Sequence, residues 1–176
     1  MAATWPIFQT KLTVYLTKKK GKQKETARKI ALEYHKAVRT AFPTTIKGAT
    51  PLTGNFKLIQ KGFETSFDLA FKSKKAITPA TWTPAALGIV AYWTGLAFNP
   101  VVPPPGYVPG VSNLVVFPGV PVAPLIWRAM NAKKERNVAK GLVRAFKTHL
   151  KSVSGVFIGN PVGSPSPVPF PWVGVG

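Results

Sequence analysis

Hydrophobic residues recur at helical spacing in five stretches of the chain. The expected helices cover residues 5–16, 22–41, 56–71, 84–97 and 124–153. Thr4 is placed to cap the first helix, with Pro6 in its first turn, and Pro43 should end the second. We expect loops over 18–21, where lysines break the pattern, and over 48–54.

Four of these stretches have a single apolar side, which predicts the part that each contributes to the core. These sides comprise Trp5, Phe8, Leu12, Tyr15 and Leu16; Ala27, Ile30, Tyr34, Ala37, Val38 and Ala41; Phe56, Ile59, Phe63, Phe67, Ala70 and Phe71; and Val138, Leu142, Ala145, Phe146, His149 and Val153. The stretch 84–97 is apolar on nearly all sides, so we expect it to be the central buried helix. Gly141 should bend or weaken the last helix.

Two segments rich in proline and glycine interrupt or follow the helices. Residues 99–124 are expected to form an ordered crossover with a short strand at 114–117. Prolines at near-alternate positions in 155–176 exclude a helix and a central strand, because alternate N–H groups are missing. We therefore predict a mainly α fold: an irregular bundle of about five helices in one domain over 1–154, with the crossover inside it and an extended arm over 155–176.

Charge is distributed in blocks. The chain has 24 basic and 5 acidic residues, a net charge of +19, all of it within 1–75 and 128–151. Residues 76–127 and 152–176 carry no charge, which is unusual for the surface of a soluble monomer and favours coverage by other protein. The longest apolar run, 85–98, is shorter than the ~20 residues that span a bilayer, so membrane contact is the weaker hypothesis, with Trp82 and Trp93 as its interfacial anchors.

Few residues are available for catalysis or metal binding. The chain has no cysteine, two histidines (His35 and His149) and no glycine-rich phosphate loop. Glu33 is two residues from His35, and such neighbours do not face each other on a helix. We expect both histidines to be structural, and we expect no enzyme activity, cofactor or metal.

The densest basic cluster spans a loop and the start of the second helix. It consists of Lys18, Lys19, Lys20, Lys22, Lys24, Arg28 and Lys29, with smaller clusters at Lys72, Lys74 and Lys75 and at Lys133, Lys134 and Arg136. A helix start accepts anions, so this cluster is a candidate contact for a phosphate backbone. Because lysine predominates, nucleic acid would be bound without sequence preference and with a steep salt dependence. A solvated face, or one docked on an acidic protein, is the alternative.

The end of the arm is the candidate for binding a partner protein. Its residues are Pro165, Pro167, Val168, Pro169, Phe170, Pro171 and Trp172. Proline stiffening lowers the entropy cost of docking an extended segment, and Phe170 and Trp172 would each contribute on the order of 2–3 kcal/mol when buried. The alternative is an arm that folds back along its own domain.

The sequence resembles small accessory virion proteins of large double-stranded DNA viruses and tailed phages. The segments that prompt the comparison are 62–67, 149–155 and 170–172. The resemblance implies a structural subunit of the virion, such as a minor capsid, cement or tail-associated protein. Its partners would be other structural proteins, including copies of itself, which it bridges through uncharged surfaces and the arm. A sequence-independent nucleic-acid-binding protein is the alternative function.

Overall fold

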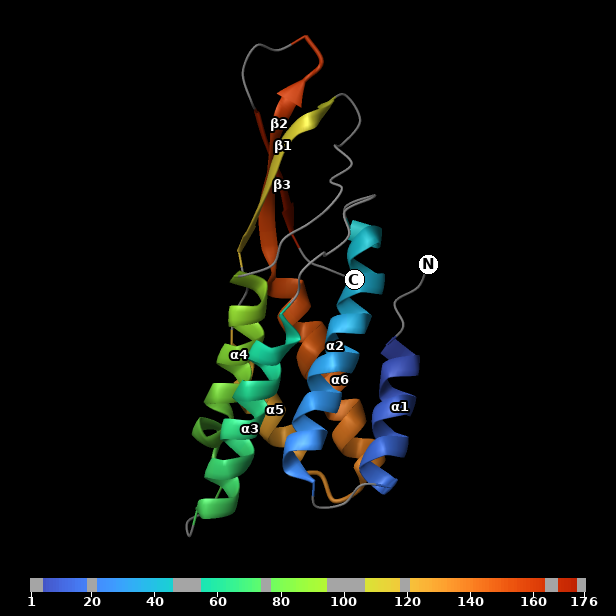
Figure 1. The fold of residues 1–176 in the computed structure, drawn as a ribbon, viewed down its shortest axis with the longest axis vertical. Helices are drawn as coiled ribbons and strands as arrows, with labels where there is room; N and C mark the ends of the chain where they lie inside the picture. Colours follow the sequence, from blue (N-terminus) through green and yellow to red (C-terminus); the bar gives the residue numbers. More distant parts are fainter. Residues whose placement is uncertain are drawn as a thin grey trace.

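Helices form the body of the protein, and a small sheet projects beyond one end of it (Figure 1). The computed structural model describes residues 5–18, 22–45, 55–73, 77–94, 107–117, 121–163 and 168–173. These contain helices α1 (Trp5–Lys18), α2 (Gln23–Thr45), α3 (Phe56–Lys72), α4 (Thr83–Thr94), α5 (Ala123–Met130) and α6 (Glu135–Ser152), a 3-10 turn at Pro79–Trp82, and strands β1 (Tyr107–Phe117), β2 (Ser154–Pro161) and β3 (Val168–Val173). The mainly α fold class is confirmed.

The predicted apolar sides of α1, α2 and α6 meet in one core. Trp5, Phe8 and Leu12 of α1 are buried, as are all the predicted residues of α2 from Ala27 to Val38. The predicted residues of α6 and its end, from Leu142 to Val153, are also buried, and Val138 is partly buried. The prediction is wrong for Phe71, which lies in the last turn of α3 and is 81% exposed. α1 extends through Lys18, so the first residue of the loop expected over 18–21 is helical instead. Thr4, the rest of that loop, the expected loop over 48–54 and the side chain of Ala41 lie outside the described part of the chain.

Tyr34 stands at the centre of this core. Its ring packs edge-on against Phe146 of α6 at 4.8 Å and against Tyr92 of α4 at 5.6 Å between ring centroids. Phe8 of α1 in turn packs against Phe146 at 5.8 Å. The buried Tyr34 hydroxyl accepts a hydrogen bond of 2.8 Å from the indole N–H of Trp93. Four helices therefore meet around one aromatic cluster whose buried polar groups satisfy each other.

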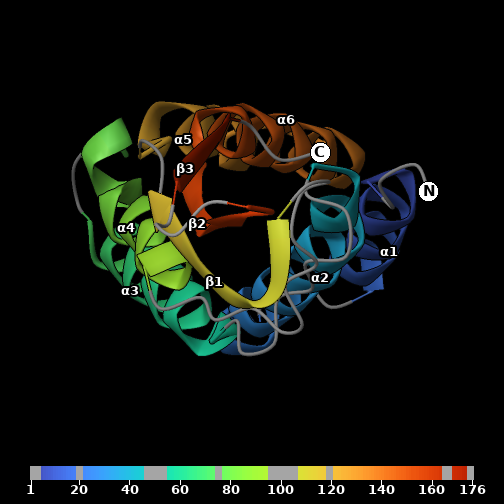
Figure 2. The same cartoon turned by 90° about the horizontal axis from the view of Figure 1, so that it is seen from above.

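Helices α3 and α4 approach each other closely through two glycines. A Cβ added at Gly62 would lie 2.4 Å from the carbonyl oxygen of Pro84, and one added at Gly88 would lie 2.7 Å from that of Leu58. The small residues of α4 thus face α3, whereas Leu87 on another side is 51% exposed. The expectation of a central helix buried on all sides is wrong, since α4 lies at the outside of the bundle beside α3 (Figure 2).

The single long helix expected over 124–153 is two helices. α5 ends at Met130, where the N–H of Asn131 still bonds to the carbonyl of Trp127, and α6 begins at Glu135. The break lets α5 fold against α6, and Gly141 makes this contact: a Cβ there would lie 2.7 Å from the Cβ of Ala129. Gly141 lies inside a continuous α6, where its lack of a side chain allows the close packing of α5.

Two other predicted boundaries differ from the structure. α2 continues past Pro43 to Thr45, because a proline in the last turn removes only one backbone hydrogen bond, the one to the carbonyl of Arg39. α4 begins one residue before the expected Pro84, directly after the 3-10 turn. Its described part ends at Thr94, so the expected extension to 97 lies outside the described residues.

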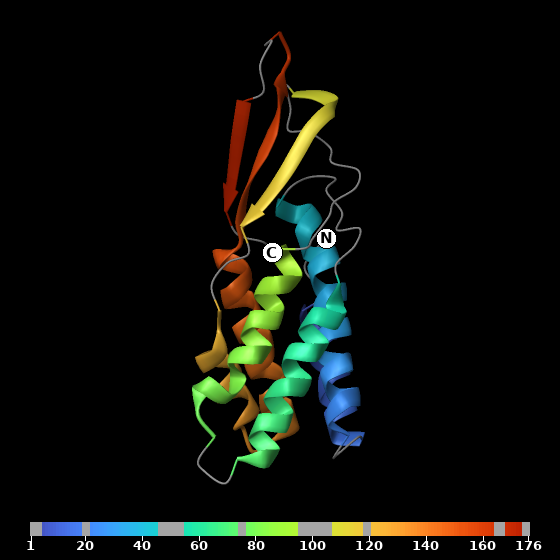
Figure 3. The same cartoon turned by 60° about the vertical axis from the view of Figure 1, so that its left-hand side comes forward.

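The sheet joins the crossover to the C-terminal arm. Its strand order is β1-β2-β3, and both pairs are antiparallel. The short strand expected at 114–117 is the end of the longer β1. β2 follows α6 after one intervening residue, so the arm leaves the helix as a strand and returns as β3 (Figure 3). Within this chain the arm is extended as expected, and it pairs with itself and with the crossover.

Prolines decide where β3 can lie in the sheet. Pro169 and Pro171 pair in register with Ile158 and Val156 but have no N–H to donate. The N–H groups that can bond to β2 therefore belong to the alternate residues Val168, Phe170 and Trp172, and the proline positions face away from β2. The prediction that this segment cannot join a central strand is confirmed, because β3 is an edge strand.

Replacing Gly62 with alanine should destabilise the protein. In an ordinary helix position this change stabilises by up to about 1 kcal/mol. Here the added methyl group must displace backbone of α4, and such overpacking costs about 1–3 kcal/mol. We expect the free energy of unfolding from chemical denaturation to fall in Gly62→Ala and to change by less than about 0.5 kcal/mol in Lys61→Ala, an exposed neighbour in α3. An unchanged or increased stability of Gly62→Ala would show that α3 and α4 are not in this contact.

Candidate anion-binding surface

The charged side chains all belong to the helical body and its connections. The strands carry none, and neither does α4. Four of the five acidic residues (Glu25, Glu33, Glu64 and Asp68) lie on α2 and α3. Basic charge on α5 and α6 therefore has few carboxylates near it, so this helix pair has different electrostatic surroundings from α2 and α3.

The predicted cluster at the start of α2 is only partly brought together, and acidic residues accompany it. Lys22, Lys24 and Arg28 are exposed and line a shallow depression of about 460 Å³ that Glu25 also lines. Lys24 also lines a smaller hollow with Glu64 and Asp68.

Lys29 of the same cluster is turned to a carboxylate. Its ammonium group lies 3.1 Å from the buried carboxylate of Glu33, and Lys22 lies 3.9 Å from Glu25. Lys18 ends α1, and its side chain, like Lys19 and Lys20, lies outside the described residues. The described part of this cluster is thus a mixed surface of both signs.

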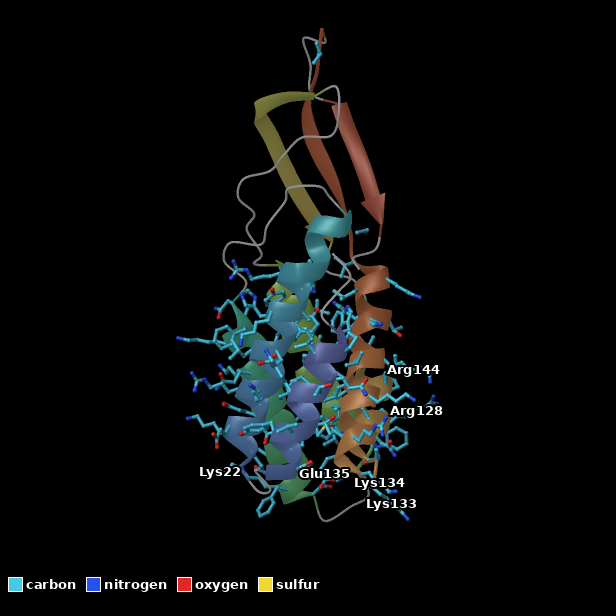
Figure 4. The ribbon with its side chains drawn as sticks, turned by 90° about the vertical axis from the view of Figure 1, so that its right-hand side faces the viewer. Lys22, Arg128, Lys133, Lys134, Glu135 and Arg144 are labelled. Atoms are coloured by element: carbon cyan, nitrogen blue, oxygen red, sulfur yellow. The ribbon has the colours of Figure 1, made fainter. Side chains whose placement is uncertain are left out.

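A more uniformly basic surface lies over α5 and α6. Five basic residues on α6 follow each other at intervals of four, four, three and four, which places them along one exposed side of the helix. They are Arg136, Lys140, Arg144, Lys147 and Lys151. Exposed Arg128 of α5, together with Lys133 and Lys134 of the connection, extends this α5–α6 basic surface, and its only acidic residue is Glu135 (Figure 4).

Only part of this surface is predictable from the sequence. The sequence predicts the smaller cluster of Lys133, Lys134 and Arg136 and shows the excess of basic residues in 128–151. The remaining basic residues of α6 are spaced by three or four positions, and this spacing indicates that they share one face of a helix. Arg128 had no such signal, because its position next to α6 depends on the break between α5 and α6.

A cavity of about 140 Å³ opens between α5 and α6 within the basic surface. It is lined by Leu125, Arg128, Ala129, Asn137, Gly141 and Arg144. The cavity lies where Gly141 and Ala129 bring the two helices together. Two arginines and an amide thus surround a small hollow that no carboxylate lines.

His35 contacts a tyrosine. Its Nδ1 lies 2.8 Å from the hydroxyl of Tyr92, within hydrogen-bond distance. Burial lowers the pKa of His35 below its usual value, and the positive charge of Arg39 lowers it further. Burial raises the pKa of Tyr92, so the phenol stays protonated and can donate to a neutral imidazole.

The described residues hold no group of three histidine, cysteine, aspartate or glutamate side chains arranged to bind a metal ion. His149 is fully buried in α6. None of the helices in the described ranges combines the length and the apolar character needed to cross a membrane. Of the predicted arm site, Val168 to Trp172 form most of β3, while Pro165 and Pro167 lie outside the described residues.

Comparison of the chain with protein-family models, with curated proteins and with solved structures finds no match.

The His35–Tyr92 contact predicts that acid destabilises the protein. With its pKa lowered in the folded state, His35 binds protons less readily there than in the unfolded chain. Stability should therefore fall as the pH drops from 7.5 through the ordinary histidine pKa of about 6.5 and towards the folded value. We expect the difference in free energy of unfolding between the wild type and His35→Gln, measured by denaturation at each pH, to shrink over this range. A difference that stays constant would contradict the preference for neutral His35.

Proposed function

We propose that the chain is a structural subunit of a large assembly, in line with its resemblance to minor virion proteins. One observation carries the proposal: a basic helical body bears an uncharged three-stranded sheet beyond one end (Figures 1 and 3). Such a molecule has two kinds of surface at different places. The sheet offers contact to neighbouring protein, and the body offers contact to acidic material.

The composition of the sheet supports this role. Its strands come from the two uncharged blocks of the chain, 76–127 and 152–176. Soluble monomers ordinarily keep charged residues on all exposed surfaces, which prevents association. A sheet without any charge is therefore expected to be covered when the protein functions.

The arm is suited to such a contact. Phe170 and Trp172 are two residues apart in β3, so they belong to the same face of the strand. The prolines between and beside them fix the backbone before binding, which reduces the entropy lost when a partner docks.

A second function, sequence-independent binding of nucleic acid, is favoured by a separate observation. The α5–α6 basic surface gathers eight basic residues and one acidic residue between Arg128 and Lys151. The two functions are compatible in one molecule, because their surfaces lie on different elements.

The structural role predicts that acidic substitutions in β3 block incorporation. In the cells that produce the chain, the tagged wild type should sediment with large particles in a density gradient, even after nuclease treatment and in 0.5 M salt. Phe170→Asp with Trp172→Asp should reduce this fraction at least tenfold, since two buried anchors contribute several kcal/mol.

The matched control is Leu69→Asp with Leu87→Asp, which adds the same charge at exposed positions of α3 and α4. This control should sediment like the wild type. The structural role is refuted by a wild-type chain that stays at the top of the gradient. It is equally refuted when nuclease releases the chain, or when the β3 substitutions have no effect.

A further inference from the structure

The cavity between α5 and α6 is lined by two arginines and by no acidic residue. Arg128 and Arg144 are sixteen positions apart in the sequence but lie next to each other on the same side of the body (Figure 4). Neither forms an ion pair with any residue in the described part of the chain, and no lining residue of the cavity is acidic. Two guanidinium groups that line one small cavity repel each other, and an anion bound between them would offset this repulsion.

The groups that line the cavity suit a phosphate. Guanidinium groups donate paired N–H bonds to phosphate oxygens, and the side-chain amide of Asn137 adds a neutral donor. Close packing of Gly141 on Ala129 fixes the two helices that carry the arginines. The donors therefore start from backbones whose relative position is set by the fold, which lowers the cost of binding.

The surroundings of the cavity indicate a polymer. The basic side chains of α6 from Arg136 to Lys151 extend over about 22 Å, since each residue rises about 1.5 Å. Their steps of three or four residues place a positive charge every ~4.5–6 Å along the helix. A phosphate backbone presents negative charges at comparable regular intervals, with one per ~3.4 Å of axis on each strand.

From this arrangement we infer that the α5–α6 basic surface binds duplex nucleic acid, with one backbone phosphate seated between Arg128 and Arg144. The inference rests on the second function above and gives that function a site. The exposed side of α6 has no aromatic residue on which unpaired bases could stack, since its one aromatic residue, Phe146, is buried. Contact is therefore to the backbone and independent of sequence.

Fluorescence anisotropy with the full chain and two 20-base-pair DNA duplexes of unrelated sequence tests the inference. Both duplexes should bind with equal affinity, and the logarithm of the binding constant should fall with the logarithm of salt at a slope of about −5, as expected for ~6 neutralised phosphates. Arg128→Gln with Arg144→Gln should weaken binding at least tenfold and reduce the slope by about 1, because the pair neutralises one phosphate. Arg128→Lys with Arg144→Lys keeps the charge but loses the paired donors, so its loss should be intermediate.

The control removes the same charge from the other side of the bundle. Lys57→Gln with Lys61→Gln alters exposed residues of α3, which lies across the bundle from α6 (Figure 2). It should change affinity less than threefold, and circular dichroism and denaturation midpoints should show that all variants are folded. Equal losses in the control and in the arginine pair would overturn the phosphate site.

A third pair of substitutions separates the site from the function. Lys140→Gln with Lys147→Gln should weaken duplex binding by about as much as the arginine pair. If only the lysine pair weakens duplex binding, the protein binds nucleic acid but no backbone phosphate lies between the two arginines. No duplex binding by the wild type at 50 mM salt would refute both. Tighter binding to poly-glutamate than to the duplexes would replace nucleic acid with an acidic protein.

Discussion

The hydroxyl group of Tyr34 is the polar point about which the helical body is arranged. It is fully buried, and it accepts the indole N–H of Trp93 in the middle of an aromatic cluster. A buried donor and acceptor must face each other closely, since leaving either unpaired costs about 1–3 kcal/mol. This requirement fixes α2 relative to α4. The rings of Phe146 and Phe8, packed on or near Tyr34, then fix α6 and α1.

Two glycine contacts extend this centre to the remaining helices. Gly62 and Gly88 attach α3 to α4, and Gly141 attaches α6 to Ala129 of α5. Each contact depends on the lack of a side chain, so it tolerates almost no substitution. The arginine-lined cavity follows directly from the second contact, because α5 reaches the basic side of α6 only by folding against it. Surface chemistry here thus depends on packing in the interior.

The sequence predicted the helical body well because amphipathic spacing reports burial directly. Tyr34, Phe63 and Leu142 were all placed on packing sides, and all are buried. Spacing alone could not predict the break after Met130, since both halves continue a helical pattern and the contact at Gly141 that accompanies the break is a tertiary one. For the same reason, the sequence does not predict that Arg128 belongs to the basic surface of α6. The pairing of β1 with β2 was equally hidden, because it joins segments about forty residues apart.

The prolines of β3 have a consequence for the behaviour of the sheet at high concentration. An edge strand with free N–H groups templates the addition of further strands, which is how amyloid-like fibrils grow. Pro169 and Pro171 remove these donors from the outer edge of β3, so addition on that side cannot propagate. An uncharged sheet lacks the electrostatic protection that lysines give to other edge strands. In this protein the imino acids take over that protective role along the outer edge of β3.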